Sequence, residues 1–128
     1  FIVDAAHNAG AADKMAESIR HYFNGKKLIY IMGVFADKEY KIVLEKTAHF
    51  AEKIYTIETP DNPRALPAEE LAKAARVYNS SAESTKSIKD AVEKAFSCAG
   101  DDENSVILAF GSLSFIGALT DAVEEYVG

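Results

Sequence analysis

The stretch that decides the fold is "LIYIM" at residues 28–32, in which every residue is apolar and two are β-branched. A strand with one face in water alternates apolar and polar residues, whereas a strand that is apolar throughout is covered on both faces, as in a parallel sheet. Gly33 ends this run. The stretch "VILAF" at residues 106–110 has the same character and is followed by Gly111. The two stretches therefore predict the interior of a parallel sheet.

Shorter apolar runs and amphipathic segments complete the pattern. Strands are also expected at residues 1–3, 53–58 and 76–81, the last of which reads "RVYNSS". Apolar residues recur with helical spacing over residues 12–23, 40–48, 67–75, 88–96 and 113–126. Strands that alternate with helices are joined by right-handed crossovers. The predicted fold class is thus α/β, with a doubly wound, mostly parallel, Rossmann-like sheet and helices on both faces.

Three local signals mark the ends of the helices. Asn24 and Gly25 are expected to end the first helix, because glycine readily adopts the left-handed conformation found there. Pro67 suits the first position of the third helix, where no backbone N–H is needed. Ser84 is expected to cap the fourth helix with its hydroxyl group.

Length, charge and cysteine content narrow the function. The 128 residues suit one domain, and the net charge of −6 disfavours a nucleic acid partner. No apolar run approaches the roughly 20 residues needed to cross a bilayer, so no membrane association is expected. The single cysteine, Cys98, fits a reducing, cytoplasmic location and is expected to pack near a helix end. Because the chain begins inside an apolar run without a starting Met, we expect it to be a piece of a longer protein.

Polar residues that follow the predicted strands are the candidate site, because open α/β sheets bind ligands beyond the carboxyl ends of their strands. Asp4, His7 and Asn8 follow the first strand. An aspartate there can accept from ribose hydroxyls, and a histidine can carry charge near phosphate at the start of the next helix. The alternative is that Asp4 and Asn8 cap the turn and His7 is simply exposed.

Two other loops carry candidate residues. The loop "TPDNPR" at residues 59–64 is stiffened by prolines and presents Arg64, whose guanidinium can clamp a carboxylate or phosphate. The alternative for Arg64 is a surface arginine after an Asx-turn. Ser112 follows the last strand and either contacts an anion or hydroxyl, or caps the final helix. The sequence contains no P-loop, zinc-ligand spacing or nucleophile elbow.

Four motifs in order resemble the C-terminal domain of the folylpolyglutamate synthase family, which includes the bifunctional dihydrofolate synthases and lies within the Mur ligase superfamily. They are "DAAHNA" at residues 4–9, "GVFADKE" at 33–39, "PRALPAEEL" at 63–71 and "GSLSFIG" at 111–117. Three residues depart from the family pattern: Ala5 replaces glycine, Ala9 replaces proline and Glu39 replaces aspartate. The first two change the stiffness of the loop more than its chemistry.

The resemblance implies an ATP-dependent amide ligase. ATP would phosphorylate the terminal carboxylate of folate or a folylpolyglutamate, and the amino group of glutamate would attack the resulting acyl phosphate. In this family the P-loop, the Mg²⁺ ligands and most of the folate site belong to preceding domains. Residues 1–128 are therefore expected to form a single C-terminal ligase domain that lacks its N-terminal ATPase domain. We expect no catalytic or metal-binding residue in this fragment alone, which would be inactive by itself.

The resemblance also implies roles for particular residues. Asp4 and His7 would contact the nucleotide near ribose and phosphate, Asn8 would support their loop, and Ser112 would lie near the same cleft. Arg64, with Asn62, would hold the glutamate carboxylate, since a related "DNPR" clamps a carboxylate in the Mur ligase that adds a diamino acid. The expected partners are the protein's own N-terminal ATPase domain, folate or dihydropteroate, and glutamate, with this domain acting as a closing lid.

Two alternatives remain at this point. One is the C-terminal domain of a Mur-type ligase that adds an amino acid to a peptidoglycan precursor, although "PRALPAEEL" and "GSLSFIG" favour the folate branch. The other is a non-enzymatic, flavodoxin-like receiver or nucleotide-sensing module. A receiver requires a phosphoacceptor aspartate at the end of its third strand, where this chain has Glu58, Thr59 and Pro60.

Overall fold

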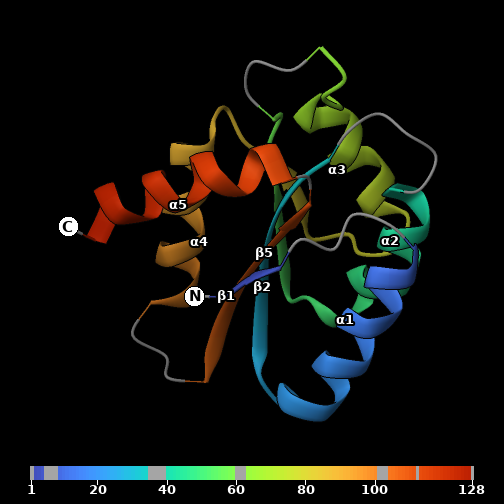
Figure 1. Ribbon diagram of the computed structural model, residues 1–128. Helices are drawn as coiled ribbons and strands as arrows, with labels where there is room; N and C mark the ends of the chain where they lie inside the picture. The colour runs from blue at the N-terminus through green and yellow to red at the C-terminus, as the bar shows by residue number, and fades with distance from the viewer. Residues whose placement is uncertain are drawn as a thin grey trace.

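The computed structural model describes residues 2–4, 9–34, 40–59, 63–100, 104–111 and 113–127. In these ranges a single parallel sheet has the strand order β1-β5-β2-β3-β4 (Figure 1). Its strands are β1 (Ile2–Asp4), β2 (Lys27–Gly33), β3 (Lys53–Thr56), β4 (Ala82–Ser84) and β5 (Ser105–Gly111). The helices are α1 (Ala9–Tyr22), α2 (Tyr40–Thr47), the 3₁₀ turn η1 (Ala48–Phe50), α3 (Ala68–Arg76), α4 (Ile88–Ala99) and α5 (Leu113–Val127). The predicted α/β class and alternating order are confirmed.

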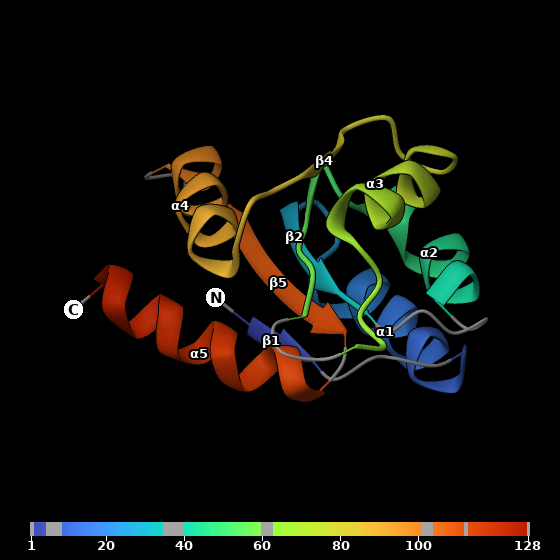
Figure 2. The same ribbon diagram turned by 90° about the horizontal axis from the view of Figure 1, so that it is seen from above.

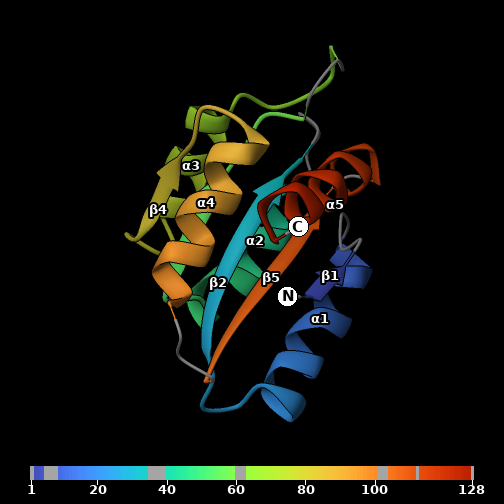
Figure 3. The ribbon, with the colours of Figure 1, turned by 90° about the vertical axis from the view of Figure 1, so that its left-hand side faces the viewer.

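The central strand β2 is covered on both faces, as its sequence predicts. Leu28, Tyr30 and Met32 belong to one buried cluster, with side chains from α1, α2 and α3. Ile29 and Ile31 belong to the other, with side chains from α4 and α5. Figure 2 shows these two groups of helices on opposite sides of the sheet, and Figure 3 shows α4 crossing its face with α5 beside it.

Two local features, the end of α1 and the place of Cys98, agree with the sequence. The chain turns after α1 at Gly25, whose φ of 82° lies in the left-handed region that glycine tolerates. Cys98 is partly buried against the cluster under α4 and α5, near the end of α4. No helix in the described ranges is long and apolar enough to span a bilayer.

The predicted strand at residues 76–81 is wrong, because β4 begins only at Ala82. Val77 is 76% exposed, so no neighbour covers the apolar side chain that favoured a strand there. Asn79 instead organises a turn: its Nδ2 donates to the carbonyl oxygens of Ala48 at 2.8 Å and Ala51 at 2.6 Å. The strand forms where Ala82, only 5% exposed, reaches the register position opposite Ile54.

Two predicted helix starts and one strand end also differ from the structure. Ser84 lies in β4 and donates to Glu69 at 2.7 Å, whereas the cap of α4 is Ser87, whose Oγ accepts from the Asp90 N–H at 3.0 Å. Pro67 is the N-cap of α3 rather than its first residue, so the helix begins one residue later than predicted, at Ala68. Strand β3 ends at Thr56, two residues earlier than predicted, where its pairing with β4 ends at Ser84.

Candidate functional site

The carboxyl ends of four neighbouring strands meet at one edge of the sheet. Asp4, the last residue of β1, lies opposite Phe110 in β5. Gly33, the last residue of β2, lies opposite Gly111, the last residue of β5. Thr56, the last residue of β3, lies opposite Met32 in β2. Because all four strands are parallel, the loops that follow them leave from this common edge, which we call the carboxyl edge.

The helix that follows β5 lies on the opposite face of the sheet from the helices that follow β1, β2 and β3. After β1, β2 and β3 the chain enters α1, α2 and α3, which pack on one face of the sheet. After β5 it enters α5, which packs on the other face. Since β5 lies between β1 and β2, this is a topological switch point, where sheets of this kind bind ligands.

The residues predicted to contact nucleotide belong to loops that leave this switch point. The backbone of Asp4 is placed at the carboxyl edge beside β5. His7 and Asn8 follow it in the chain, and Ser112 directly follows Gly111, but these three residues lie outside the described part of the structure. Asn62, predicted to assist Arg64, also lies outside it. The structure thus brings two of the strand ends concerned together, and the contacts of these side chains stay predictions.

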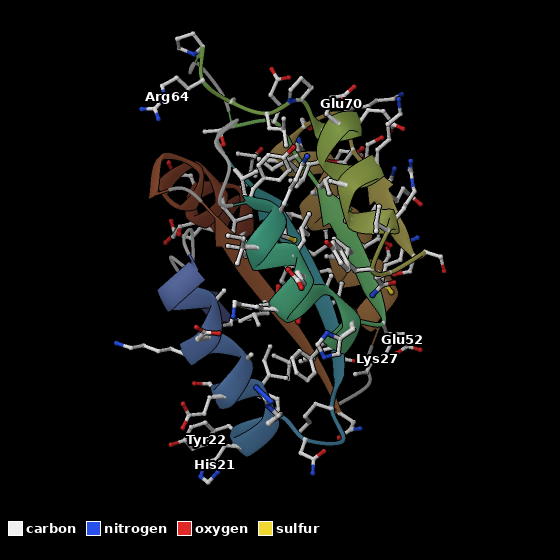
Figure 4. The ribbon with its side chains drawn as sticks, turned by 90° about the vertical axis from the view of Figure 1, so that its right-hand side faces the viewer. His21, Tyr22, Lys27, Glu52, Arg64 and Glu70 are labelled. Carbon is white, nitrogen blue, oxygen red and sulfur yellow. The ribbon has the colours of Figure 1, made fainter. Side chains whose placement is uncertain are left out.

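Arg64 is described, and it lies on the loop at residues 57–67 between β3 and α3. Both ends of this loop are held to the end of β2. The Ile57 N–H donates to the Met32 carbonyl oxygen at 2.8 Å, and the Leu66 N–H donates to the Val34 carbonyl oxygen at 3.0 Å. Arg64 is exposed, and Figure 4 shows its guanidinium directed away from the body of the domain.

The base of this loop contains a part-buried hydrogen bond that sequence reasoning missed. The Thr56 hydroxyl donates to the carbonyl oxygen of Ala68, the first residue of α3, at 2.7 Å. The carbonyl oxygen of Thr56 accepts from both the N–H and the Oγ1 of Thr85, at 3.0 and 2.8 Å. The only signal in the sequence is a threonine in the apolar run that forms β3, which by itself does not reveal its acceptor.

A second polar cluster lies where α4 faces β3 and β4. An open cavity of about 770 Å³ there is lined by side chains of β3, β4 and α4. Its two lysines are each paired with a carboxylate: Lys53 with Glu83 at 3.3 Å, and Lys94 with Glu83 at 3.2 Å and with Asp90 at 3.5 Å. Hydrogen bonding from Lys94 lowers the pKa of Glu83, and burial raises the pKa of Tyr55, which lines the same cavity, to about 12. This mutual pairing explains the cluster as a structural ion network.

The described residues contain no cluster of three or more His, Cys, Asp or Glu side chains that could hold a metal ion. Among the described residues, the ion pairs of this network involve two carboxylates: lysines contact both oxygens of Glu83 and the Oδ2 atom of Asp90.

Comparison with known proteins identifies the family to which this chain belongs. The model of the family described as "Mur ligase, glutamate ligase domain" matches residues 1–113. The chain belongs to this family. The resemblance drawn from the four motifs is confirmed at the level of the family, and the non-enzymatic receiver is disfavoured.

Proteins that are similar to this chain carry folate-related names. The dihydrofolate synthase/folylpolyglutamate synthase of Mycobacterium tuberculosis is 29% identical over 101 residues, covering 77% of this chain and 20% of that protein. The protein of the same name from Bacillus subtilis is 28% identical over 114 residues, covering 89% of this chain and 25% of that one. The chain thus spans about a quarter of the length of these relatives or less.

Solved structures agree with this placement. The structure of M. tuberculosis folylpolyglutamate synthase complexed with ADP matches 94% of this chain and 29% of its own with a TM-score of 0.82 and 26% identity. A second structure of the M. tuberculosis enzyme, complexed with ADP and AMPPCP, gives a TM-score of 0.81 at 27% identity. These values show that the chain has the fold of the matching part of these folylpolyglutamate synthase structures.

Proposed function

We propose that this chain is the C-terminal domain of an ATP-dependent ligase that adds glutamate to folate or a folylpolyglutamate through an acyl phosphate. Residues 1–128 form a single domain of a longer protein, and ATP and Mg²⁺ are held mainly by a preceding ATPase domain. The observation that carries the proposal is the carboxyl edge, where the ends of β1 and β5 adjoin at a switch point in a chain of this family. The folate-related names of similar proteins support the choice of substrate.

The geometry suits a lid rather than a complete active site. An acyl phosphate must be protected from water, because hydrolysis would otherwise compete with attack by the amine. A domain that closes over the nucleotide excludes water and brings the amine into line in the same movement. The loops from β1, β2, β3 and β5 all leave from one edge, so a single closing motion brings them to the reaction together.

Each candidate residue has a role in this lid. Asp4 and His7 bind the nucleotide near ribose and phosphate, Asn8 supports their loop, and Ser112 binds at the same cleft. Arg64, with Asn62 beside it, binds the free carboxylate of the incoming glutamate. Two observations support the role of Arg64: its side chain is exposed, and its loop is anchored at both ends. A side chain that binds a carboxylate through two hydrogen bonds must be accessible to the substrate and must be held in place.

A peptidoglycan-precursor ligase is the second candidate, because the family model that matches is shared by the Mur ligases. The two candidates use the same chemistry on different acceptors. The test is to assay the full-length protein for ATP-dependent incorporation of labelled glutamate into a tetrahydrofolate acceptor and, separately, into a nucleotide-linked peptidoglycan precursor. We expect incorporation only into the folate, and turnover of the peptidoglycan precursor alone would replace the proposal with the alternative.

The lid role makes a separate prediction for the chain by itself. Residues 1–128 alone should hydrolyse ATP no faster than a buffer control. Robust ATP turnover by this fragment would contradict a lid that depends on a second domain.

A further inference from the structure

The loop that carries Arg64 is closed at its base by one side chain. Thr56 is the last residue of β3, Ala68 is the first residue of α3, and the Thr56 Oγ1 donates to the Ala68 carbonyl oxygen at 2.7 Å. The Thr56 side chain is fully buried. This hydrogen bond therefore ties the point where the chain leaves the sheet to the point where it enters the helix, with Arg64 between them.

The sheet side of this contact is itself fixed. The Thr56 carbonyl oxygen accepts two hydrogen bonds from Thr85, and the next residue, Ile57, donates to Met32 in β2. On the other side, Leu66 is only 8% exposed and donates to Val34 just beyond β2. The Thr56 hydroxyl thus connects a rigid sheet to the start of α3, four residues after Arg64.

We propose that Thr56 is a positioning residue for Arg64. Its hydroxyl holds the start of α3 against the end of β3 and so fixes where the Arg64 guanidinium meets the carboxylate of the incoming amino acid. The proposal rests on the function given above, in which Arg64 binds that carboxylate. Valine has nearly the same shape as threonine but carries no hydroxyl, so Thr56→Val removes the hydrogen bond to Ala68 while keeping a side chain of similar size.

The direction of the effect follows from the geometry that a clamp requires. Two parallel hydrogen bonds between guanidinium and carboxylate tolerate little displacement, and positioning groups act by holding such pairs in register. Without the Thr56 hydroxyl the start of α3 is held less firmly, so the Arg64 guanidinium samples a wider range of positions. Binding of the amino acid should weaken, whereas binding of ATP, which uses loops from β1 and β5, should not.

The chain offers a matched control in Thr47. This side chain is also fully buried, and its Oγ1 also donates to a backbone carbonyl oxygen, that of Val43, at 2.7 Å. Both groups lie within α2, so this hydrogen bond joins no two elements and holds no loop. Thr47→Val therefore removes the same kind of bond from a fully buried side chain without touching the base of the Arg64 loop.

The experiment uses the full-length ligase with Thr56→Val, Thr56→Ser and Thr47→Val. Thr56→Val should raise the KM for glutamate about three- to tenfold, the loss that one buried hydrogen bond represents. It should leave the KM for ATP within about twofold, and Thr56→Ser should restore the wild-type value because it keeps the hydroxyl. Thr47→Val should lower the melting temperature without moving either KM. If Thr56→Val does not fold, Thr56→Ala removes the same hydroxyl and carries the same expectation.

Arg64→Ala, alone and combined with Thr56→Val, separates this proposal from the one it rests on. If Thr56 acts through Arg64, the double variant has the KM for glutamate of Arg64→Ala alone. A raised KM in Arg64→Ala with no change in Thr56→Val refutes the role of Thr56 and leaves the proposed function standing. No change in Arg64→Ala refutes the amino-acid site and the role of Thr56 together.

Discussion

Replacing Arg64 by alanine in the full-length ligase should selectively weaken binding of glutamate. Arg64 is exposed on a loop anchored through Ile57 and Leu66, so the substitution removes a guanidinium without opening the buried core. A charge-assisted, bidentate pair contributes about 1.5–3 kcal/mol, which corresponds to a ten- to hundredfold rise in the KM for glutamate. The KM for ATP should stay within about twofold of wild type.

The assay is incorporation of labelled glutamate at saturating ATP and folate, with each substrate then varied in turn. Arg64→Lys keeps the charge but loses the two-pronged geometry, so its KM should fall between those of wild type and Arg64→Ala. Arg20→Ala is the matched control, since it removes the same charge from an exposed position on α1, where the guanidinium lies 5.8 Å from the centre of the Phe50 ring. Equal increases in the KM for glutamate and for ATP, or an Arg20→Ala variant as impaired as Arg64→Ala, would refute the assignment.

Further predictions concern stability. Ser87→Ala should lower the free energy of unfolding, measured in urea, by about 1 kcal/mol, because α4 loses its N-cap. Ser84→Ala removes only the exposed hydrogen bond to Glu69 and should cost less than half of that. A larger loss for Ser84→Ala than for Ser87→Ala would contradict the assignment of Ser87 as the cap. Tyr30→Phe should lower the free energy of unfolding by about 1–2 kcal/mol in the same assay, because it removes a buried hydroxyl that donates to the Thr47 carbonyl oxygen at 2.7 Å. An unchanged free energy of unfolding would contradict that contact. Glu83 has a lowered pKa, so its stabilising effect is present above the ordinary glutamate value of about 4.3 and is lost as pH falls through the folded value. Urea titrations should show Glu83→Gln slightly less stable than wild type at pH 7 and equal to it in acid, and a difference that grows with acid would contradict the sign.

The sheet could be predicted from the sequence because its signal is local. A run such as residues 28–32 has no polar residue to place in water, so both of its faces must be covered wherever it lies in the molecule. Each covering helix likewise shows its own apolar stripe. Order and type of the elements follow from these patterns, and the carboxyl edge follows from the order.

The errors arose where a local preference competes with contacts to distant parts of the chain. Val77 and Tyr78 favour a strand by residue type, but the bonds of Asn79 to Ala48 and Ala51 hold that segment in a turn. The cap of α4 was recoverable, since Ser87 followed three residues later by an acidic residue resembles a capping box.

The role of Thr56 could not be predicted in this way. Its acceptor, Ala68, lies twelve residues further along the chain, and the two meet only because α3 folds back onto the sheet. The same holds for the anchoring of Leu66 by Val34. Sequence reasoning therefore proposes Arg64 as a substrate contact, whereas the hydrogen bonds at the base of its loop become visible only in the structure.

The central claim is that the carboxyl edge of this domain closes over the nucleotide and the amino acid. The most direct test is a crystal structure of the full-length ligase with a non-hydrolysable ATP analogue and glutamate bound. We predict that the nucleotide lies against the ends of β1 and β5, near Asp4 and Gly111, and that the glutamate carboxylate contacts the Arg64 guanidinium. Both ligands bound away from this edge, with the domain turned so that another face meets the ATPase domain, would contradict the account.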